Sequence, residues 1–161
     1  MSVRNNSVMP PETMSAPPNR QQILGLLARS PCKELAARIA ELGEPPAHTW
    51  LRKPETGMIM LRARIGGNGA RFNLGEATMT RCTLRLPDGS VGVGTVRGRN
   101  ARHAELVALC DAMLQQQDLA ERVRNEVVAV LAEAERLRHG RRAAEVAASK
   151  VDFFTVVRGA D

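Results

Sequence analysis

The sequence predicts an α+β protein, and three observations lead to this prediction. Apolar residues recur at helical spacing over residues 19–43 and again over residues 100–149. Between these regions side chains alternate with a period of two, which is typical of strands with two different faces. The sequence Pro-Asp-Gly-Ser at residues 87–90 joins two alternating segments as a hairpin. We therefore expect an antiparallel meander packed with an N-terminal helix pair and C-terminal helices.

A single domain is expected. The chain has 161 residues, which is enough for one domain with a substantial core. Residues 1–18 hold four of the nine prolines among Ser and Asn, without a core-forming pattern. This segment is therefore predicted to be a disordered, Pro-rich tail, and residues 19–161 are predicted to form one α+β domain.

The N-terminal helix pair is marked by its end signals. The first helix is expected to begin at Asn19, and Ser30 with Pro31 predicts the start of a second helix as N-cap and first helical residue. Gly43 is a suitable C-cap for that second helix.

On the C-terminal side, Asn100 is predicted to cap a helix that reaches about residue 117. Asp118 is then expected to cap another helix. A further helix is predicted from about residue 132 to 149, although Gly140 weakens its middle.

The strands are predicted from alternation and from the turn residues between them. Residues 53–57 contain Pro and Gly and are expected to form a turn. A last β-branched and aromatic segment is expected to pair with the sheet or with another chain, because a free strand at the end of a chain promotes aggregation. The predicted strands are residues 48–52, 58–65, 77–86, 91–97 and 151–157.

Two glycines on one face of the strand at residues 91–97 predict a close approach. Gly92 and Gly94 remove side chains from a patch of the sheet, usually so that something can lie flat on it. A helix of the same chain, a segment of a partner and a ligand all fit this pattern.

The positive charge is concentrated in the middle of the chain. The whole chain has a net charge of +6, whereas residues 52–102 carry ten basic and three acidic residues, a net charge of +7. Only three of the 23 basic residues are lysine, and arginine favours planar, bidentate pairing with phosphate or carboxylate. This asymmetry predicts an acidic partner or an anionic ligand near the sheet.

A glycine-rich loop flanked by arginines is the main candidate site. It lacks the Gly-Lys-Ser/Thr of a P-loop and no helix opens there, so it is either an anion loop or a long hairpin connection. His103 is a further candidate for anion binding, because it lies in the first turn of a predicted helix, where anions bind favourably. The candidate anion- or substrate-binding residues are Arg64, Gly66, Gly67, Asn68, Gly69, Arg71, Arg81 and His103.

No set of catalytic residues is evident in the sequence. Nothing supplies a nucleophile, base and orienting group, and no His, Cys or carboxylate spacing predicts a metal site. Nucleic acid is disfavoured as a ligand, because binders of single strands stack bases on aromatic rings and the basic segments contain only Trp50 and Phe72.

The cysteines and the hydropathy pattern predict a cytoplasmic protein. Three cysteines at wide spacing form no disulfide framework and suit a reducing compartment. The first residues have no secretory signal, and no apolar run approaches the length of about 18 residues that a membrane span needs.

The chain contains four segments, residues 52–57, 64–81, 98–105 and 151–159, whose sequences resemble those of a known family. This is the PhnG family, whose members are the G subunit of the bacterial carbon–phosphorus lyase machinery. The similarity extends in order from about Arg20 to Gly159. One departure is Asn100, where the family pattern leads us to expect Asp; Asn keeps the capping role but loses a charge.

The resemblance implies a subunit of a core complex with the H, I and J subunits, the I subunit being the most direct partner. It implies that the complex uses ATP and an alkylphosphonate such as methylphosphonate, releases adenine and forms ribose 1-methylphosphonate 5-triphosphate. It further implies part of a multi-subunit transferase without stand-alone activity, whose G subunit binds no cofactor alone and has no known catalytic residue. An assembly role is the leading hypothesis, and direct binding of a triphosphate through the glycine loop is the alternative.

Overall fold

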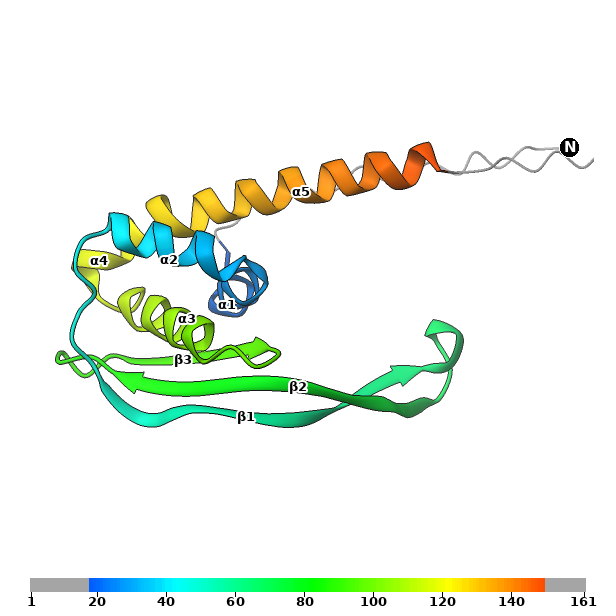
Figure 1. Ribbon diagram of the computed structural model, residues 1–161, viewed down its shortest axis with the longest axis horizontal. Helices are drawn as coiled ribbons and strands as arrows, with labels where there is room; N and C mark the ends of the chain where they lie inside the picture. Colours follow the sequence, from blue (N-terminus) through cyan, green and yellow to red (C-terminus); the bar gives the residue numbers. More distant parts are fainter. Residues whose placement is uncertain (1–17, 150–161) are drawn as a thin grey trace, which may run out of the picture.

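The computed structural model describes residues 18–149 and has the predicted α+β architecture. A three-stranded antiparallel sheet in the order β1-β2-β3 carries its helices on one side, and two elements project from the body in the same direction (Figure 1). The elements are α1 (Arg20–Arg29), α2 (Cys32–Glu41), β1 (Thr49–Arg64), η1 (Ile65–Gly67), β2 (Arg71–Arg85), β3 (Val91–Arg97), α3 (Ala101–Met113), α4 (Gln117–Arg122), η2 (Val123–Val128) and α5 (Ala129–Ala148).

The meander is confirmed in its second half. β2 and β3 are joined by the predicted turn at residues 87–90, in which the Leu86 amide donates to the Ser90 carbonyl oxygen at 2.9 Å. Alternate residues of β2 lie on opposite faces of the sheet, as predicted, and every second residue from Thr80 faces the helices. These buried residues are Thr80, Cys82, Leu84 and Leu86.

Helix α3 lies flat on the glycine patch, so the occupant of this patch is a helix of the same chain. A Cβ atom added at Gly92 would overlap the carbonyl oxygen of Ala108, and one added at Gly94 would overlap that of Ala104. The glycines and the small alanines thus let backbone approach backbone. Ten of the thirteen residues of α3 are buried, which makes it the central helix.

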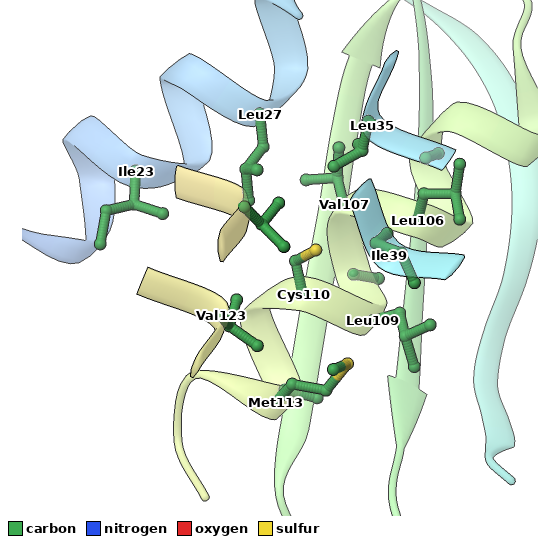
Figure 2. Packing of buried hydrophobic residues seen from close by; sticks show 14 of the residues in the cluster. Ile23, Leu27, Leu35, Ile39, Leu106, Val107, Leu109, Cys110, Met113 and Val123 are labelled. Atoms are coloured by element: carbon green, nitrogen blue, oxygen red, sulfur yellow. The ribbon is translucent and has the colours of Figure 1, made fainter. Parts of the chain in front are cut away.

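The hydrophobic core forms where α3 meets the N-terminal pair. Figure 2 shows Ile23 and Leu27 of α1, together with Leu35 and Ile39 of α2, directed toward the side chains of α3. Leu27 and Leu35 are fully buried, in agreement with the apolar stripes that predicted these helices.

One buried carboxylate ties three elements together. Asp111 in α3 accepts two hydrogen bonds from the guanidinium of Arg20 at 2.8 and 2.7 Å, and one from the amide of Val93 at 2.9 Å. Because a buried charge is costly unless it is paired, this arrangement fixes the start of α1 against α3 and β3.

Beyond the pair Met79–Arg97, β1 and β2 continue without a third strand. We call this two-stranded extension, residues 58–78, the ribbon arm (Figure 1). The alternation at residues 58–65 predicted a strand with two different faces, but both faces are exposed and only Ala63 is half-buried. The helices of the body do not reach this far, so neither face is covered.

The predicted turn at residues 53–57 is wrong. β1 runs through it without interruption, with shifts in register between Trp50 and Arg52 and between Arg52 and Glu55. β1 is an edge strand of the described sheet, where Pro54 needs no hydrogen bond on its outer side. β2 also begins six residues earlier than predicted, at Arg71, because the loop closes more tightly than expected.

Helix ends were predicted to within a few residues. Asn100 is an N-cap as expected, and its side chain accepts from the His103 amide at 2.9 Å. The first helix starts where it was predicted, with Asn19 as its N-cap. Ser30 is not a cap: it is buried, its hydroxyl donates to the Leu26 carbonyl oxygen, and α2 begins at Cys32. Gly43 follows α2 with a φ of 111°.

The C-terminal helices are joined more continuously than predicted. α4 begins at Gln117, so Asp118 lies in its first turn instead of capping it, and η2 leads directly into α5. Gly140 does not interrupt α5. After Leu131 no residue of α5 is buried, and this half of the helix projects on the same side as the ribbon arm (Figure 1). The predicted strand at residues 151–157 and the predicted tail, except for Pro18, lie outside the described residues.

Candidate functional site

The glycine loop lies at the exposed end of the ribbon arm and is closed by its own hydrogen bonds. The Gly69 amide donates to the Ile65 carbonyl oxygen at 2.8 Å, and the Ile65 amide donates to that of Ala70 at 3.2 Å. Gly66 and Gly67 have φ values of 57° and 87°, in the left-handed region that favours glycine. The geometry of a tight turn therefore accounts for these glycines without a ligand.

Three arginines gather beside this loop. Arg64 and Arg71 are directly opposite each other in the register of β1 and β2, and Arg62 lies two residues before Arg64. Together with Ala63 they line a hollow of about 400 Å³. Like charges directly opposite each other destabilise a sheet, so this arrangement favours an anionic counterpart. None of the ion pairs among residues 18–149 involves these three arginines.

Arg81 belongs to a different place on the sheet. Its Nε donates to Oε1 of Glu55 across the strands at 2.8 Å, and Arg52 lies 3.5 Å from the same carboxylate oxygen. The structure therefore does not bring Arg81 together with the loop, and its guanidinium already has a carboxylate partner.

His103 lies in the body of the protein, away from the loop. It is buried, and its Nε2 is 3.0 Å from the carbonyl oxygen of Leu27. A carbonyl oxygen can only accept, so Nε2 carries the proton and donates. This bond joins α3 to the end of α1 and gives His103 a structural contact, while its anion-binding role stays a prediction.

The ribbon arm carries a large exposed apolar surface, which we call the ribbon patch. Its side chains are between 39% and 64% exposed and lie on both faces of the ribbon. Contiguous exposed apolar surface on a soluble protein marks a contact site. The residues of the ribbon patch are Met58, Ile59, Met60, Leu61, Ile65, Phe72 and Leu74.

A second basic site was not predicted from the sequence. Side chains from α1, β2, β3, α3 and α5 surround an open hollow of about 720 Å³, which we call the arginine hollow. Its charged walls are formed by Arg29, Arg97, Arg138, Arg142 and Glu135. The packing of α1 against both β3 and α5 brings these residues together, and no spacing in the sequence signals it.

Residues 18–149 contain no group of three or more His, Cys, Asp or Glu side chains placed to hold a metal ion. Within the same residues, none of the helices combines the length and apolar character that crossing a membrane requires. What the geometry offers is an apolar ribbon and two basic hollows, which suit binding.

Comparison with known proteins agrees with the resemblance. The family described as phosphonate metabolism protein PhnG matches residues 18–159. This chain belongs to the PhnG family. A relative from Rhizobium meliloti (strain 1021), named alpha-D-ribose 1-methylphosphonate 5-triphosphate synthase subunit PhnG, is 41% identical over 145 residues. The match covers 88% of this chain and 90% of that relative, so the PhnG similarity includes the body and the ribbon arm alike.

Proposed function

We propose that this chain is the G subunit of a carbon–phosphorus lyase core complex and that its main role there is assembly. Membership of the PhnG family and the name of the Rhizobium meliloti relative, a subunit of a synthase, support this proposal. The chain then contributes to an enzyme as one part of a larger complex in phosphonate catabolism, in the cytoplasm.

The observation that carries the assembly role is the ribbon patch. A two-stranded ribbon is marginally stable in water by itself, and this one exposes apolar side chains on both faces. A partner that encloses the arm removes this surface from water, which contributes about 25 cal/mol for each Å² of apolar area. We propose the I subunit as the protein that encloses the arm, within a complex that also contains the H and J subunits.

The chemistry belongs to the complex as a whole. In this proposal the complex uses ATP and an alkylphosphonate, releases adenine and forms ribose 1-methylphosphonate 5-triphosphate, as a transferase does. The G subunit binds no cofactor by itself. Its own contribution is to hold the partner subunit in place through the ribbon arm.

Co-expression with the H, I and J subunits tests the assembly role. The tagged chain is expected to retain the I subunit during purification, and mass measurement gives the composition of the complex. The double variant Ile59→Ser with Leu61→Ser should lose the I subunit, because both residues lie on the same face of β1 and the polar side chains remove apolar contact area from that face. The matched control, Leu51→Ser with Val130→Ser, changes two equally exposed apolar residues outside the arm and should retain it. A chain that never retains the I subunit would refute the proposal.

Substitution of the arginines beside the loop distinguishes a role in assembly from a role in substrate binding. The double variant Arg64→Ala with Arg71→Ala is expected to weaken assembly, because amides of the loop are used within the turn and both arginines are exposed, so that a partner can reach them. Arg64 also donates to the Gly69 carbonyl oxygen at 3.3 Å. An intact complex that has lost turnover would instead assign these arginines to the triphosphate or phosphonate.

A further inference from the structure

The arginine hollow lies between the ribbon arm and the projecting half of α5, where both leave the body. Met79 and Arg97, the last pair of β2 and β3, form one wall, and the exposed half of α5 forms the wall opposite. The end of α1 lies between them (Figure 1). The hollow is therefore formed by the part of the body from which the ribbon arm and α5 project.

The charge of this hollow is strongly positive. Four arginines face a single carboxylate, Glu135, which accepts from Arg29 at 2.9 and 3.4 Å. The hydrogen bond from Arg29 holds the pKa of Glu135 below its ordinary value, so this carboxylate stays ionised. Arg138 is paired with Glu34 at 3.0 Å. Two of the four guanidinium groups are thus engaged in ion pairs that position them.

The other two guanidinium groups, on Arg97 and Arg142, have no such partner. Neither takes part in any ion pair formed among the described residues, and both side chains are exposed. They come from β3 and α5, and both line the hollow. An anion in the hollow could therefore accept hydrogen bonds from two different elements.

The floor of the hollow is rigid. His103 donates to the Leu27 carbonyl oxygen and Ser30 to that of Leu26, so both polar side chains are fixed. Gly25 makes room beside Arg29, since a Cβ atom there would lie 3.0 Å from its Nη1. A rigid site loses less conformational entropy when a ligand binds.

From this geometry we infer that the arginine hollow binds an oligophosphate group, such as the triphosphate of a nucleotide or of a phosphorylated sugar. Arginine forks match phosphate oxygens bidentately, and a chain of phosphates carries enough charge to engage several of them at once. A hollow of about 720 Å³ is larger than a single phosphate needs. This site lies outside the ribbon arm, and the inference goes beyond the proposed assembly role.

Titration of the purified full-length chain with inorganic tripolyphosphate, followed by calorimetry at physiological salt, tests this inference. The chain should bind tripolyphosphate more tightly than inorganic phosphate or sulfate. The variant Arg97→Gln with Arg142→Gln should bind about a hundredfold more weakly, or about tenfold for each charge-assisted contact removed. The control Arg85→Gln with Arg124→Gln removes the same charge from exposed sites elsewhere and should bind within about twofold of the parent.

Three results would overturn the inference. The parent chain could fail to bind tripolyphosphate, the two double variants could weaken binding equally, or polyglutamate could displace tripolyphosphate and bind more tightly. The last result would identify the hollow as a docking site for an acidic protein segment. Unchanged circular dichroism and melting of each variant exclude unfolding as the cause. Retention of the I subunit is measured separately, so the two proposals can fail independently.

Discussion

At the scale of single residues, the close packing of the central helix on the sheet depends on two glycines, which have no side chain. Gly92 and Gly94 lie under the backbone of α3, and the facing residues Ala104 and Ala108 are the smallest that a helix favours. The contact fixes the distance between the central helix and the sheet, and the position of His103 in the same helix follows from it.

Substitution of Gly94 tests this contact. We expect Gly94→Ala to lower the free energy of unfolding by about 1–3 kcal/mol, because the new methyl group overlaps the Ala104 carbonyl oxygen and forces α3 to move. Chemical denaturation measures the change. Gly57→Ala is the matched control, since it lies in a strand with open space around it and should change stability by less than about 0.5 kcal/mol. Equal stability of both variants would contradict the close approach.

The cysteines offer a second test at this scale. Burial raises the pKa of the Cys82 thiol to about 11 and that of Cys110 to about 12. A thiol with a raised pKa stays protonated at pH 8, and only the thiolate reacts quickly. We therefore expect one fast and two slow thiols when the native chain is treated with Ellman's reagent at pH 8. The fast one should be the half-exposed Cys32.

The variant Cys32→Ser identifies that fast thiol. It should remove the fast phase and leave the slow ones, while the chain unfolded in guanidinium chloride should show all its thiols reacting quickly. A fast phase that survives the substitution would show that Cys82 or Cys110 is accessible in the folded protein.

At the scale of elements, the ribbon arm shows what alternation in a sequence can predict and what it cannot. The alternation at residues 58–65 predicts a strand, and the strand is there. The same alternation indicates that Ile59 and Leu61 share a face, but it carries no information about what covers that face. The register shifts that carry β1 through Pro54 were also missed, because the Pro and Gly at residues 53–57 are equally typical of turns.

Hydrogen exchange distinguishes the arm from the rest of the sheet. In the isolated chain, amides of residues 58–64 and 71–77 should exchange faster than those of residues 80–85, although all belong to strands. The reason is that the arm has no third strand and no covering helix, so it opens locally at low free-energy cost. Addition of the I subunit should slow exchange in the arm. Equal protection of both regions in the isolated chain would be inconsistent with an exposed arm.

At the scale of the whole molecule, two extended elements leave one compact body on the same side. The ribbon arm has an apolar surface and basic end, and the outer half of α5 has no buried residue (Figure 1). A chain with so much uncovered surface is expected to be incomplete without a partner.

Self-association of the isolated chain is the expected consequence. Sedimentation velocity over a series of concentrations should show oligomers that grow with concentration, because two ribbon patches can cover each other in the absence of the I subunit. The variant Ile59→Ser with Leu61→Ser should shift the distribution toward the monomer, whereas Leu51→Ser with Val130→Ser should not. A parent chain that remains monomeric throughout would argue against the ribbon patch as a contact surface.

The sequence by itself determined the elements and the sides of those elements that can be buried. Helical spacing, alternation, the turn at residues 87–90 and the cap Asn100 are local signals, because each depends on neighbours within a few residues along the chain. The concentration of arginine and the family resemblance were also readable from the sequence.

Only the tertiary structure decided which of those sides is covered and which distant charges meet. It placed α3 over Gly92 and Gly94, left both faces of the ribbon arm exposed, and brought Arg97 and Arg142 to the same hollow. The physical reason is that burial and electrostatic pairing depend on distances through space between residues far apart in the chain, which periodicity and spacing along the chain do not specify.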